Sequence, residues 1–545
     1  MRAAAFVRAQ QIDSDSDAGP LFDNPPPGSD PEILKRLRQM YEAGGWVLVE
    51  SAIADLPADL RWVYESGAVT IEQLATIYRA LGATSAADLA EAAREQRLRT
   101  LPGIGAGVEA AVAEAVPTLR ASVPRVPLGR ATGIADVMLE RLRTVAGIAW
   151  AHPAGSLRRG QDTVGDIEIV ASSDRPADAI DALLELPESA HVLHRSDRQL
   201  YVLADRVQVG VRLPAPAAAG AMLLYLTGSI AHFELLRAHA AAAGCRLTAA
   251  GLYAADGALL PTASEDALYA ALGLPCIPPE IRNGDEEIDR AARGDLPTLV
   301  SLRDIRGDLH MHSIWSDGRD PIDAMVRGCR SLGYEYMAIT DHSPHSAATR
   351  NLTADGVRKQ AEEIARLREQ HPGITILHGC EVDILADGRL DFPDKILERF
   401  DLVLASLHEA AGHSPEQLMK RYETTMKHPL VTIITHPTNR LVPHRAGYNL
   451  DYDRLFALAV ETGTVLEIDG APSHLDLDGA MARRAVAAGA TVSIDSDCHR
   501  SEMLGRQMQL GIITARRGWV EPRHVLNTRS LADVRSFIAA KRGAR

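Results

Sequence analysis

Residues 307–313 read GDLHMHS, a short run in which His310 and His312 alternate with apolar neighbours. This alternation places both imidazoles on one face of an extended strand. Six more short apolar runs follow, with helical stretches between them: YMAIT at 336–340, ITILHGCEV at 374–382, DLVLASLH at 401–408, VTIITHP at 431–437, TVLEIDGA at 464–471 and TVSIDSDCH at 491–499. Strands that alternate with helices over about 240 residues predict a parallel (β/α)₈-type barrel, or a close variant, over 304–545.

Side chains of the kinds that bind metals gather at the carboxyl ends of these predicted strands. Thirteen of the 19 histidines lie between His310 and His499. In a parallel barrel the carboxyl ends of the strands meet on one face, where active sites form. The candidate ligands are His310, His312, Asp317, His342, Glu381, His408, His436, Asp497 and His499. The set contains no thiolate, so it suits Zn²⁺ or Mn²⁺ in clustered sites.

A histidine on its own at a strand end is more often a hydrogen-bonded core residue than a ligand. Nine ligand-type residues at the same end of successive strands argue instead for a chemical role. The remaining histidines of this region lack the placement and are assigned structural roles: His345, His371, His378, His413, His428, His444 and His474.

The segments DLHMHS, TDHS, GCEVD, SLH, THP and SDCH resemble the motif series of the PHP (polymerase and histidinol phosphatase) phosphoesterases. The resemblance covers about 304–545, and it implies a distorted TIM-like (β/α) barrel that holds up to three ions. It implies one ion on His310, His312, Glu381 and Asp497. A second ion would lie on Glu381, His408 and His436, and a third on Asp317, His342 and His499. Catalysis is then expected to centre on Glu381, Asp497 and His310.

The front half contains two further motifs. LPGIG at 101–105 precedes a predicted helix and resembles a helix–hairpin–helix, whose Gly103 and Gly105 would let backbone N–H groups reach a DNA phosphate. GSLRRGQDTVGDIEIVAS at 155–172 resembles the nucleotidyltransferase signature of the family X DNA polymerases. That resemblance implies an α+β palm in which Asp166 and Glu168 bind Mg²⁺. It also implies contacts from Ser156, Arg158 and Arg159 to an incoming triphosphate.

Several departures from that family fall in the palm site. The third carboxylate is expected on VQVGVRL, where the corresponding residue is Gly210, and Asp205 falls in the preceding turn. Glu168 is one methylene longer than the usual Asp, and Leu226 stands where an aromatic packs on the sugar. The amino-terminal lyase chemistry needs a lysine amine, and no lysine occurs between Lys35 and Lys359.

Composition limits the classes of protein that remain. The 545 residues include 46% hydrophobic and 24% charged side chains and carry a net charge of −14, which excludes a basic nucleic-acid wrapper as a property of the whole chain. Five cysteines without CxxC pairs suit a reducing cytoplasm. No apolar run is long enough to span a membrane.

These observations predict a multidomain chain with five segments. They are a disordered tail (1–30), an α-helical helix–hairpin–helix region (31–126), a palm and thumb (127–280), a charged linker (281–303) and the PHP barrel (304–545). We expect a cytoplasmic, metal-dependent DNA phosphodiesterase that acts as a 3′→5′ exonuclease in repair. DNA and nucleotides are its expected partners, and the sequence names no protein partner. The alternatives are an active DNA polymerase, a small-molecule phosphatase of the histidinol-phosphate type, and a non-catalytic DNA-binding scaffold.

Overall fold

The computed structural model describes residues 63–64, 66–81, 89, 92–93, 96–115, 125–346, 348, 350–410 and 412–543. The described residues form two compact units, one within Leu48–Leu296 and one within Pro297–Arg545. The tail expected at 1–30 and residues 31–62 of the expected helical region lie outside the described residues. The five segment boundaries given above stay predictions.

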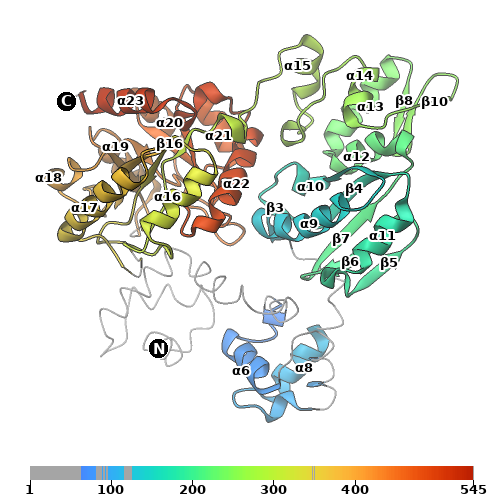
Figure 1. Cartoon of the computed structure of the whole chain (residues 1–545), viewed down its shortest axis with the longest axis horizontal. Coiled ribbons are helices and arrows are strands. Elements are labelled where there is room, and N and C mark those ends of the chain that lie inside the picture. The colour runs from blue at the N-terminus through green and yellow to red at the C-terminus, as the bar shows by residue number, and fades with distance from the viewer. Residues whose placement is uncertain are drawn as a thin grey trace. The chain divides into compact units, whose positions relative to one another are not determined.

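Seven parallel strands, which follow one another in sequence order, form the frame of the carboxy-terminal unit (Figure 1). They are β11 (Gly307–Asp308), β12 (Tyr336–Ile339), β13 (Thr375–Asp383), β14 (Leu402–Ser406), β15 (Ile433–Ile434), β16 (Val465–Asp469) and β17 (Val492–Asp495). A parallel bridge between Met311 and Cys498 joins the chain beyond β11 to the chain beyond β17. The ring is therefore nearly closed, and the TIM-like barrel expected from the sequence is confirmed.

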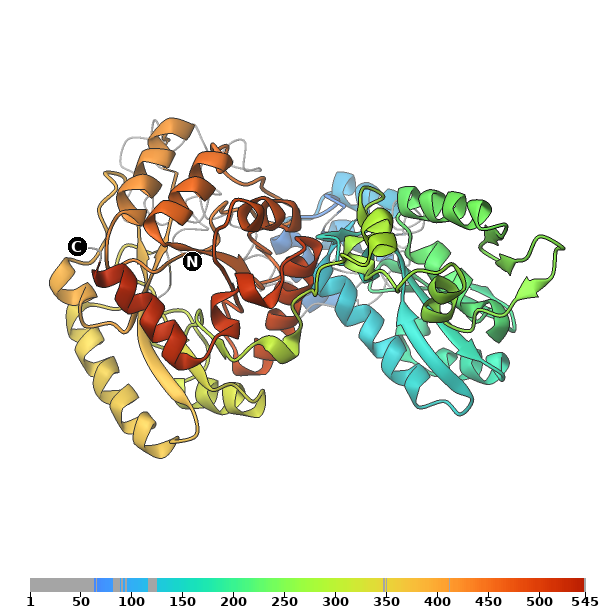
Figure 2. The same cartoon turned by 90° about the horizontal axis from the view of Figure 1, so that it is seen from above.

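Helices cover the outside of this ring, as Figures 1 and 2 show. They are α16 (Ile322–Ser331), α17 (Ala354–Gln370), α18 (Asp394–Leu397), α19 (Pro415–Met426), α20 (Tyr452–Thr462), α21 (Gly479–Ala487) and α22 (Leu504–Arg517). A further helix, α23 (Leu531–Gly543), packs against the apolar residues inside the ring. Several of the outer helices begin at side-chain caps. Ser414 starts α19 with a capping box, and Asp478 caps α21.

Alternate residues of the barrel strands face two different cores. In β12, Met337 and Ile339 pack in the large cluster beneath the helices, whereas Tyr336 and Ala338 join a smaller cluster that includes residues of α23. Residues from five neighbouring strands share the smaller cluster, so it fills the inside of the ring. The same alternation turns Glu381 on β13 and Glu467 on β16 inward. One part of the barrel interior is therefore apolar, and the carboxyl ends of the strands carry the ionisable side chains.

The other unit contains an α+β domain, which confirms the class expected for the palm. Its five-stranded sheet has the order β2-β4-β7-β6-β5, and only β4 and β7 run parallel. The strands are β2 (Ile148–Pro153), β4 (Ile167–Ser173), β5 (Val192–Arg195), β6 (Gln199–Ala204) and β7 (Val207–Arg212). A smaller antiparallel sheet follows, made of β8 (Arg246–Thr248), β9 (Gly251–Tyr253) and β10 (Leu259–Leu260).

Several helices of this unit pack on its sheets, and others pack on neighbouring helices, as α14 does on α12 (Figure 1). In the palm and the segment after it they are α9 (Leu128–Arg143), α10 (Gly155–Arg158), α11 (Pro176–Leu184), α12 (Ala219–Thr227), α13 (Ile230–Ala242), α14 (Glu265–Ala271) and α15 (Glu287–Arg293). Nearer the amino terminus lie α6 (Ile71–Leu81) and α8 (Ala106–Ala115). None of the helices that the structure describes is both long enough and apolar enough to cross a membrane.

A buried ion-pair network stabilises the region around α14. The Arg282 guanidinium is fully buried and donates to both carboxylate oxygens of Glu265, at 2.6 and 3.1 Å. Arg158 lies 2.7 Å from the same carboxylate. Burial raises the pKa of Glu265, but the two guanidiniums outweigh it and lower that pKa to about 2. Arg282 belongs to the segment that the sequence analysis assigns to a charged linker.

Two glycines at matched positions test the packing of this unit. Gly220 and Gly107 are each the second residue of a helix, α12 and α8. A methyl group at 220 would overlap the carbonyl of Ser264, whereas nothing lies within 4 Å of one at 107. We expect Gly220→Ala to lower the free energy of unfolding by ~1–3 kcal/mol. Gly107→Ala should leave it unchanged or raise it by up to ~1 kcal/mol. Urea denaturation of the full chain measures both, and equal effects would contradict the packing at α12.

Candidate metal centre

Glu381, on the inward face of β13, lies at the centre of the candidate site. Nδ1 of His342 lies 2.8 Å from its Oε2 atom, and Nε2 of His436 lies 2.9 Å from its Oε1 atom. The Nε2 atoms of three more histidines lie 3.4–3.5 Å from the same carboxylate: His310, His312 and His408. One buried carboxylate is thus surrounded by five imidazoles from four strand ends.

The remaining candidate ligands extend this cluster. Oδ1 of Asp497 lies 3.1 Å from Nε2 of His312, and Oδ1 of Asp317 lies 3.2 Å from Nε2 of His499. Oδ2 of Asp317 lies 3.6 Å from Nε2 of His342. The structure therefore brings all nine residues of the predicted set together at the carboxyl ends of the strands.

Three groups within this cluster each hold one ligand atom per residue, with all atoms of a group within 4.8 Å of one another. The groups are His312, Asp317, His342 and His499; His310, His312 and Asp497; and His342, Glu381 and His408. His312 and His342 each belong to two groups, unlike in the division that the PHP resemblance implies. The assignment of residues to individual ions stays a prediction. The structure does show that these residues form clusters that could hold metal ions.

Opposite charges balance one another within the cluster. Burial raises the pKa of Glu381, but the charges of His342, His408 and His310 outweigh it and hold that pKa well below its usual value. Burial lowers the pKa of His408, yet the carboxylates of Asp383 and Glu381 raise it to about 10. A metal ion binds neutral imidazole and ionised carboxylate, so ion binding would displace protons from these histidines.

Unsatisfied buried atoms show that the residues fit metal ions. Oε2 of Glu381 and Nδ1 of His342 are buried and 2.8 Å apart, yet neither has a partner in hydrogen-bond geometry. Nδ1 of His436 is buried without a partner as well. Leaving such atoms unpaired is costly, and dications that accept nitrogen and oxygen ligands would satisfy them.

Two carboxylates outside the predicted set, Glu467 and Asp383, hold predicted ligands in place. Oε1 of Glu467 lies 2.7 Å from Nδ1 of His310, and its Oε2 accepts from the backbone N–H of His436 at 2.7 Å. Asp383 lies 2.9 Å from Nδ1 of His408. Carboxylates in this position fix the tautomer and orientation of ligating histidines. The sequence signal that could have identified them is the alternation of side chains along a strand. It places Glu467 on the inward face of β16 and Asp383 on the inward face of β13.

Asp341, another carboxylate outside the predicted set, organises the loop after β11. It accepts hydrogen bonds from the Ser313 hydroxyl and the Ser316 hydroxyl, both at 2.6 Å. Gln360 of α17 donates to it at 2.6 Å and lies 2.9 Å from Nε2 of His378. This chain of buried polar side chains connects α17 to the loop that carries Asp317.

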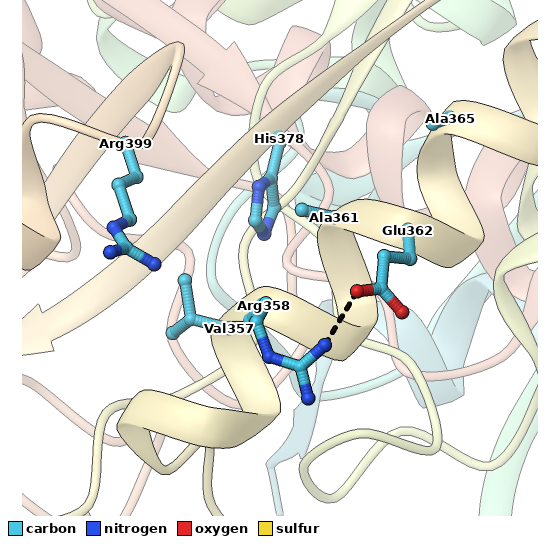
Figure 3. A pocket seen from close by; sticks show the side chains of 7 residues that line it. All are labelled: Val357, Arg358, Ala361, Glu362, Ala365, His378 and Arg399. Atoms are coloured by element: carbon cyan, nitrogen blue, oxygen red, sulfur yellow. Dashed lines mark hydrogen bonds and ion pairs between the residues drawn. The ribbon is translucent and has the colours of Figure 1, made fainter.

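A surface hollow over α17 is separate from this cluster. Figure 3 shows its lining: Val357, Arg358, Ala361, Glu362, Ala365, His378 and Arg399. None of the nine candidate ligands lines it. Arg358 and Glu362 are paired with each other at 2.6 Å. His378 is connected towards the metal-type cluster through Gln360 and Asp341.

The palm shows a different arrangement of carboxylates. Glu168 on β4 is in register with Gly210 on β7. A Cβ atom at position 210 would lie 2.6 Å from the Tyr201 ring and 2.7 Å from Oε1 of Glu168. Nε of Arg212 lies 3.1 Å from the other oxygen of Glu168. Burial raises the pKa of Glu168, and Arg212 opposes that rise. These residues do not fit a site for two ions held by three carboxylates, because a tyrosine ring and a guanidinium occupy the space.

Asp205 does not replace the missing carboxylate. It lies in the β6–β7 turn, where Nε of Arg130 donates to it at 2.9 Å. Three strand residues, 207–209, separate this turn from Gly210 and span about 10 Å at ~3.3 Å per residue.

Two of the three residues predicted to contact a nucleotide, Arg158 and Arg159, bind other groups of the protein in this structure. Arg158 donates to the Thr227 hydroxyl at 3.0 Å, besides its ion pair with Glu265, and Arg159 donates to the Thr227 carbonyl. Ser156 lies in α10 beside them. Leu226 packs against the small cluster under α12. The role of these residues in nucleotide binding stays a prediction.

The LPGIG segment forms a turn that leads into α8. Gly103 has a φ of +74°, a conformation that favours glycine, and Gln73 at the start of α6 donates to its carbonyl at 3.0 Å. Nothing lies within 4 Å of a Cβ atom built at Gly103 or Gly105. Arg99, which precedes the turn, is paired with Glu109 of α8 at 2.5 Å. DNA binding by this turn stays a prediction.

Comparisons with known proteins agree with both halves of this description. The family model of the DNA polymerase beta thumb matches residues 222–283, and the PHP domain model matches residues 308–468. The chain is 37% identical over 506 residues to "DNA polymerase/3'-5' exonuclease PolX" of Bacillus subtilis (strain 168), covering 92% of this chain and 88% of that protein. A "Probable phosphatase" of Syntrophotalea carbinolica is 29% identical over 202 residues, which is 35% of this chain and 79% of that protein.

A solved structure of Leishmania infantum polymerase beta in a ternary complex covers 38% of this chain and 92% of its own. Its sequence identity of 15% and TM-score of 0.27 are too low to establish a shared fold.

The fold and the two sites define a protein that joins a polymerase-type α+β unit to a PHP barrel with metal-type clusters. Identity of 37% over nearly the whole length of both chains shows the family. The chain belongs to the PolX family, the family X DNA polymerases that carry a PHP domain.

Metal content tests the central role of Glu381. We expect purified protein to bind more than one Mn²⁺ or Zn²⁺ ion, and Glu381→Ala to remove the largest share, because its carboxylate faces five imidazoles. The matched control is Glu335→Ala, an exposed glutamate at the amino end of β12 that is paired with Arg306. Elemental analysis after equilibrium dialysis gives the ratio of ions to protein. A full complement of ions in Glu381→Ala would contradict the assignment.

Proposed function

We propose that the barrel hydrolyses phosphodiester bonds of DNA in a metal-dependent reaction and removes nucleotides from a free 3′ end. The observation that carries this proposal is the convergence of nine His, Asp and Glu side chains around Glu381. We further propose Mn²⁺ or Zn²⁺ as the cofactor, with up to three ions. A cytoplasmic role in DNA repair fits this activity.

When bound, dications lower the pKa of coordinated water and neutralise charge on phosphate oxygens. The chain's own residues prepare the site for this chemistry. Glu381, Asp497 and His310 would hold the reacting centre, and Glu467 keeps Nδ1 of His310 engaged at 2.7 Å. Nε2 of His310 therefore faces the cluster, 3.5 Å from both Glu381 and Asp497. No protein nucleophile is required.

The relatives support this choice of reaction. The Bacillus subtilis protein has a printed name that includes both a polymerase and a 3'-5' exonuclease. Relatives that match only about a third of this chain carry the name of probable phosphatases. A second candidate function, hydrolysis of a small phosphomonoester, is favoured by those names. The polymerase-type unit attached to the barrel favours DNA.

We propose that the palm and the helix–hairpin–helix region hold DNA and contribute little or no synthesis. Phosphoryl transfer with two ions needs carboxylates that fix both. In the palm, Glu168 is paired with Arg212 and Gly210 offers no ligand. Backbone N–H groups around Gly103 and Gly105 are suited to phosphate contacts that do not read sequence.

A DNA degradation assay tests the proposed activity. With Mn²⁺ and 5′-end-labelled DNA, we expect stepwise shortening from the 3′ end and release of 5′-mononucleotides. His310→Ala should reduce the rate by at least ~10²-fold, by analogy with the loss of one electrostatic group at a reaction centre. His371→Ala is the matched control, since His371 is paired with Asp323 outside the cluster. Faster turnover of histidinol phosphate than of DNA, at equal enzyme concentration, would favour the small-molecule function.

Primer extension tests the palm in a protein whose barrel is silenced by His310→Ala. We expect no extension, and we expect Gly210→Asp alone to restore none, because Tyr201 fills the space and Arg212 pairs with Glu168. Gain of extension on Gly210→Asp alone would show that the missing carboxylate is the only defect. Robust extension by the silenced parent, abolished by Asp166→Ala, would show that the palm is an active polymerase.

A further inference from the structure

A fourth group of ligand-type side chains lies beside the nine-residue cluster. Asp469, His474 and Asp497 each offer one ligand atom, and these atoms lie within 4.8 Å of one another. Asp469 is the last residue of β16, and His474 lies in the loop that follows it. Only Asp497 belongs to the set considered so far.

Only one of the two carboxylate oxygens of Asp469 has a hydrogen-bond partner. The residue is fully buried, and its Oδ1 atom accepts from the backbone N–H of Ala471 at 2.6 Å. Its Oδ2 atom is also buried and has no hydrogen-bond partner. A carboxylate oxygen in this situation requires either a proton or a cation.

His474 has the orientation of a metal-binding histidine. Its Nδ1 atom lies 3.1 Å from the carbonyl oxygen of Arg440. A carbonyl only accepts, so Nδ1 carries the proton and Nε2 keeps its lone pair. Ligating histidines commonly hold their second nitrogen in this way. The Arg440 side chain also donates to the carbonyls of His474 and Leu475, at 2.9 and 2.6 Å, and so fixes the loop.

Asp497 can serve two neighbouring positions. Its Oδ1 atom faces the histidines of the main cluster, 3.1 Å from Nε2 of His312 and 3.5 Å from Nε2 of His310. A carboxylate has two oxygens with about four lone-pair directions, so it can also serve a second cation. Its backbone φ of +47° takes it out of the extended conformation just after β17.

We propose that Asp469, His474 and Asp497 form an additional divalent-cation site that shares Asp497 with the main cluster. Ligand atoms on one ion with bonds of about 2.1 Å lie about 3–4 Å apart, so side-chain shifts of about 1 Å complete the site. One imidazole and two carboxylates suit Mn²⁺ or Zn²⁺. The site satisfies Oδ2 of Asp469. It goes beyond the proposed DNA hydrolysis, because it binds its ion whatever substrate the barrel cleaves.

Mn²⁺ itself is the probe for this site, used with the full chain. In equilibrium dialysis we expect His474→Ala to lose one bound Mn²⁺ relative to the wild type, and Asp497→Ala to lose more than one. His428→Ala is the matched control, since His428 lies outside all four groups and is paired with Asp394. It should lose none. An unchanged ion count in His474→Ala would overturn the proposal and leave a shared proton as the partner of Asp469.

A crystal of the wild-type chain grown with Mn²⁺ makes the test independent of any variant's folding. Anomalous scattering at the manganese edge should show a peak between Asp469, His474 and Asp497, separate from peaks around Glu381. Peaks around Glu381 without one here would overturn this proposal alone. A peak here without any around Glu381 would support it and contradict the proposed hydrolytic centre, and the absence of both would overturn both.

Discussion

The balance of charge around Glu381 constrains the whole carboxyl end of the barrel. Glu381 is 1% exposed, and Asp308, Glu467, Asp469 and Asp495 are fully buried. Removing one partner of a buried ion pair typically costs ~3–5 kcal/mol, because the remaining charge is left uncompensated. The charges of His342, His408 and His310 compensate Glu381, and metal ions can replace their protons. Asp308, Asp469 and Asp495 differ, because burial raises the pKa of each and favours its protonated form. The smaller apolar cluster, which includes residues of α23, occupies a separate part of the ring.

Much of this site could be predicted from the sequence, because strand ends are visible there as apolar runs followed by ligand-type residues. Glu381 and His408 are examples, and the parallel barrel brings them together. His436 was predicted on the same ground although it leaves the extended conformation at a φ of +28°. Glu467 and His474 lie outside the predicted set. Glu467 lies two residues before the end of β16, as Glu381 does in β13, so strand alternation could have identified it. The position of His474, in contrast, depends on a loop held by the Arg440 side chain.

In the palm, the sequence could show that position 210 lacks a ligand, but not which side chains occupy the space there. Gly210 is visible as a residue without a ligand. The ring that would meet a side chain there belongs to Tyr201 on β6, the antiparallel neighbour of β7. The register between β6 and β7 is set by the turn at Asp205 and Arg206, which no motif marks. Arg212 is two residues after Gly210, so strand alternation places both on one face. The contact between Arg212 and Glu168 can be recognised only when the pairing of β4 with β7 is known.

The two sites differ in whether the cation beside the carboxylate can be exchanged. Around Glu381 the compensating groups are imidazoles, which lose a proton and then become ligands through the same nitrogen atoms. Beside Glu168 the compensating group is the guanidinium of Arg212, 3.1 Å away, which stays charged at all ordinary pH values and offers no lone pair. A metal ion that approaches Glu168 would therefore meet a fixed positive charge rather than a ligand. The two buried carboxylates thus differ in what their neighbours offer a metal ion, because an imidazole can give up its proton and become a ligand whereas a guanidinium cannot.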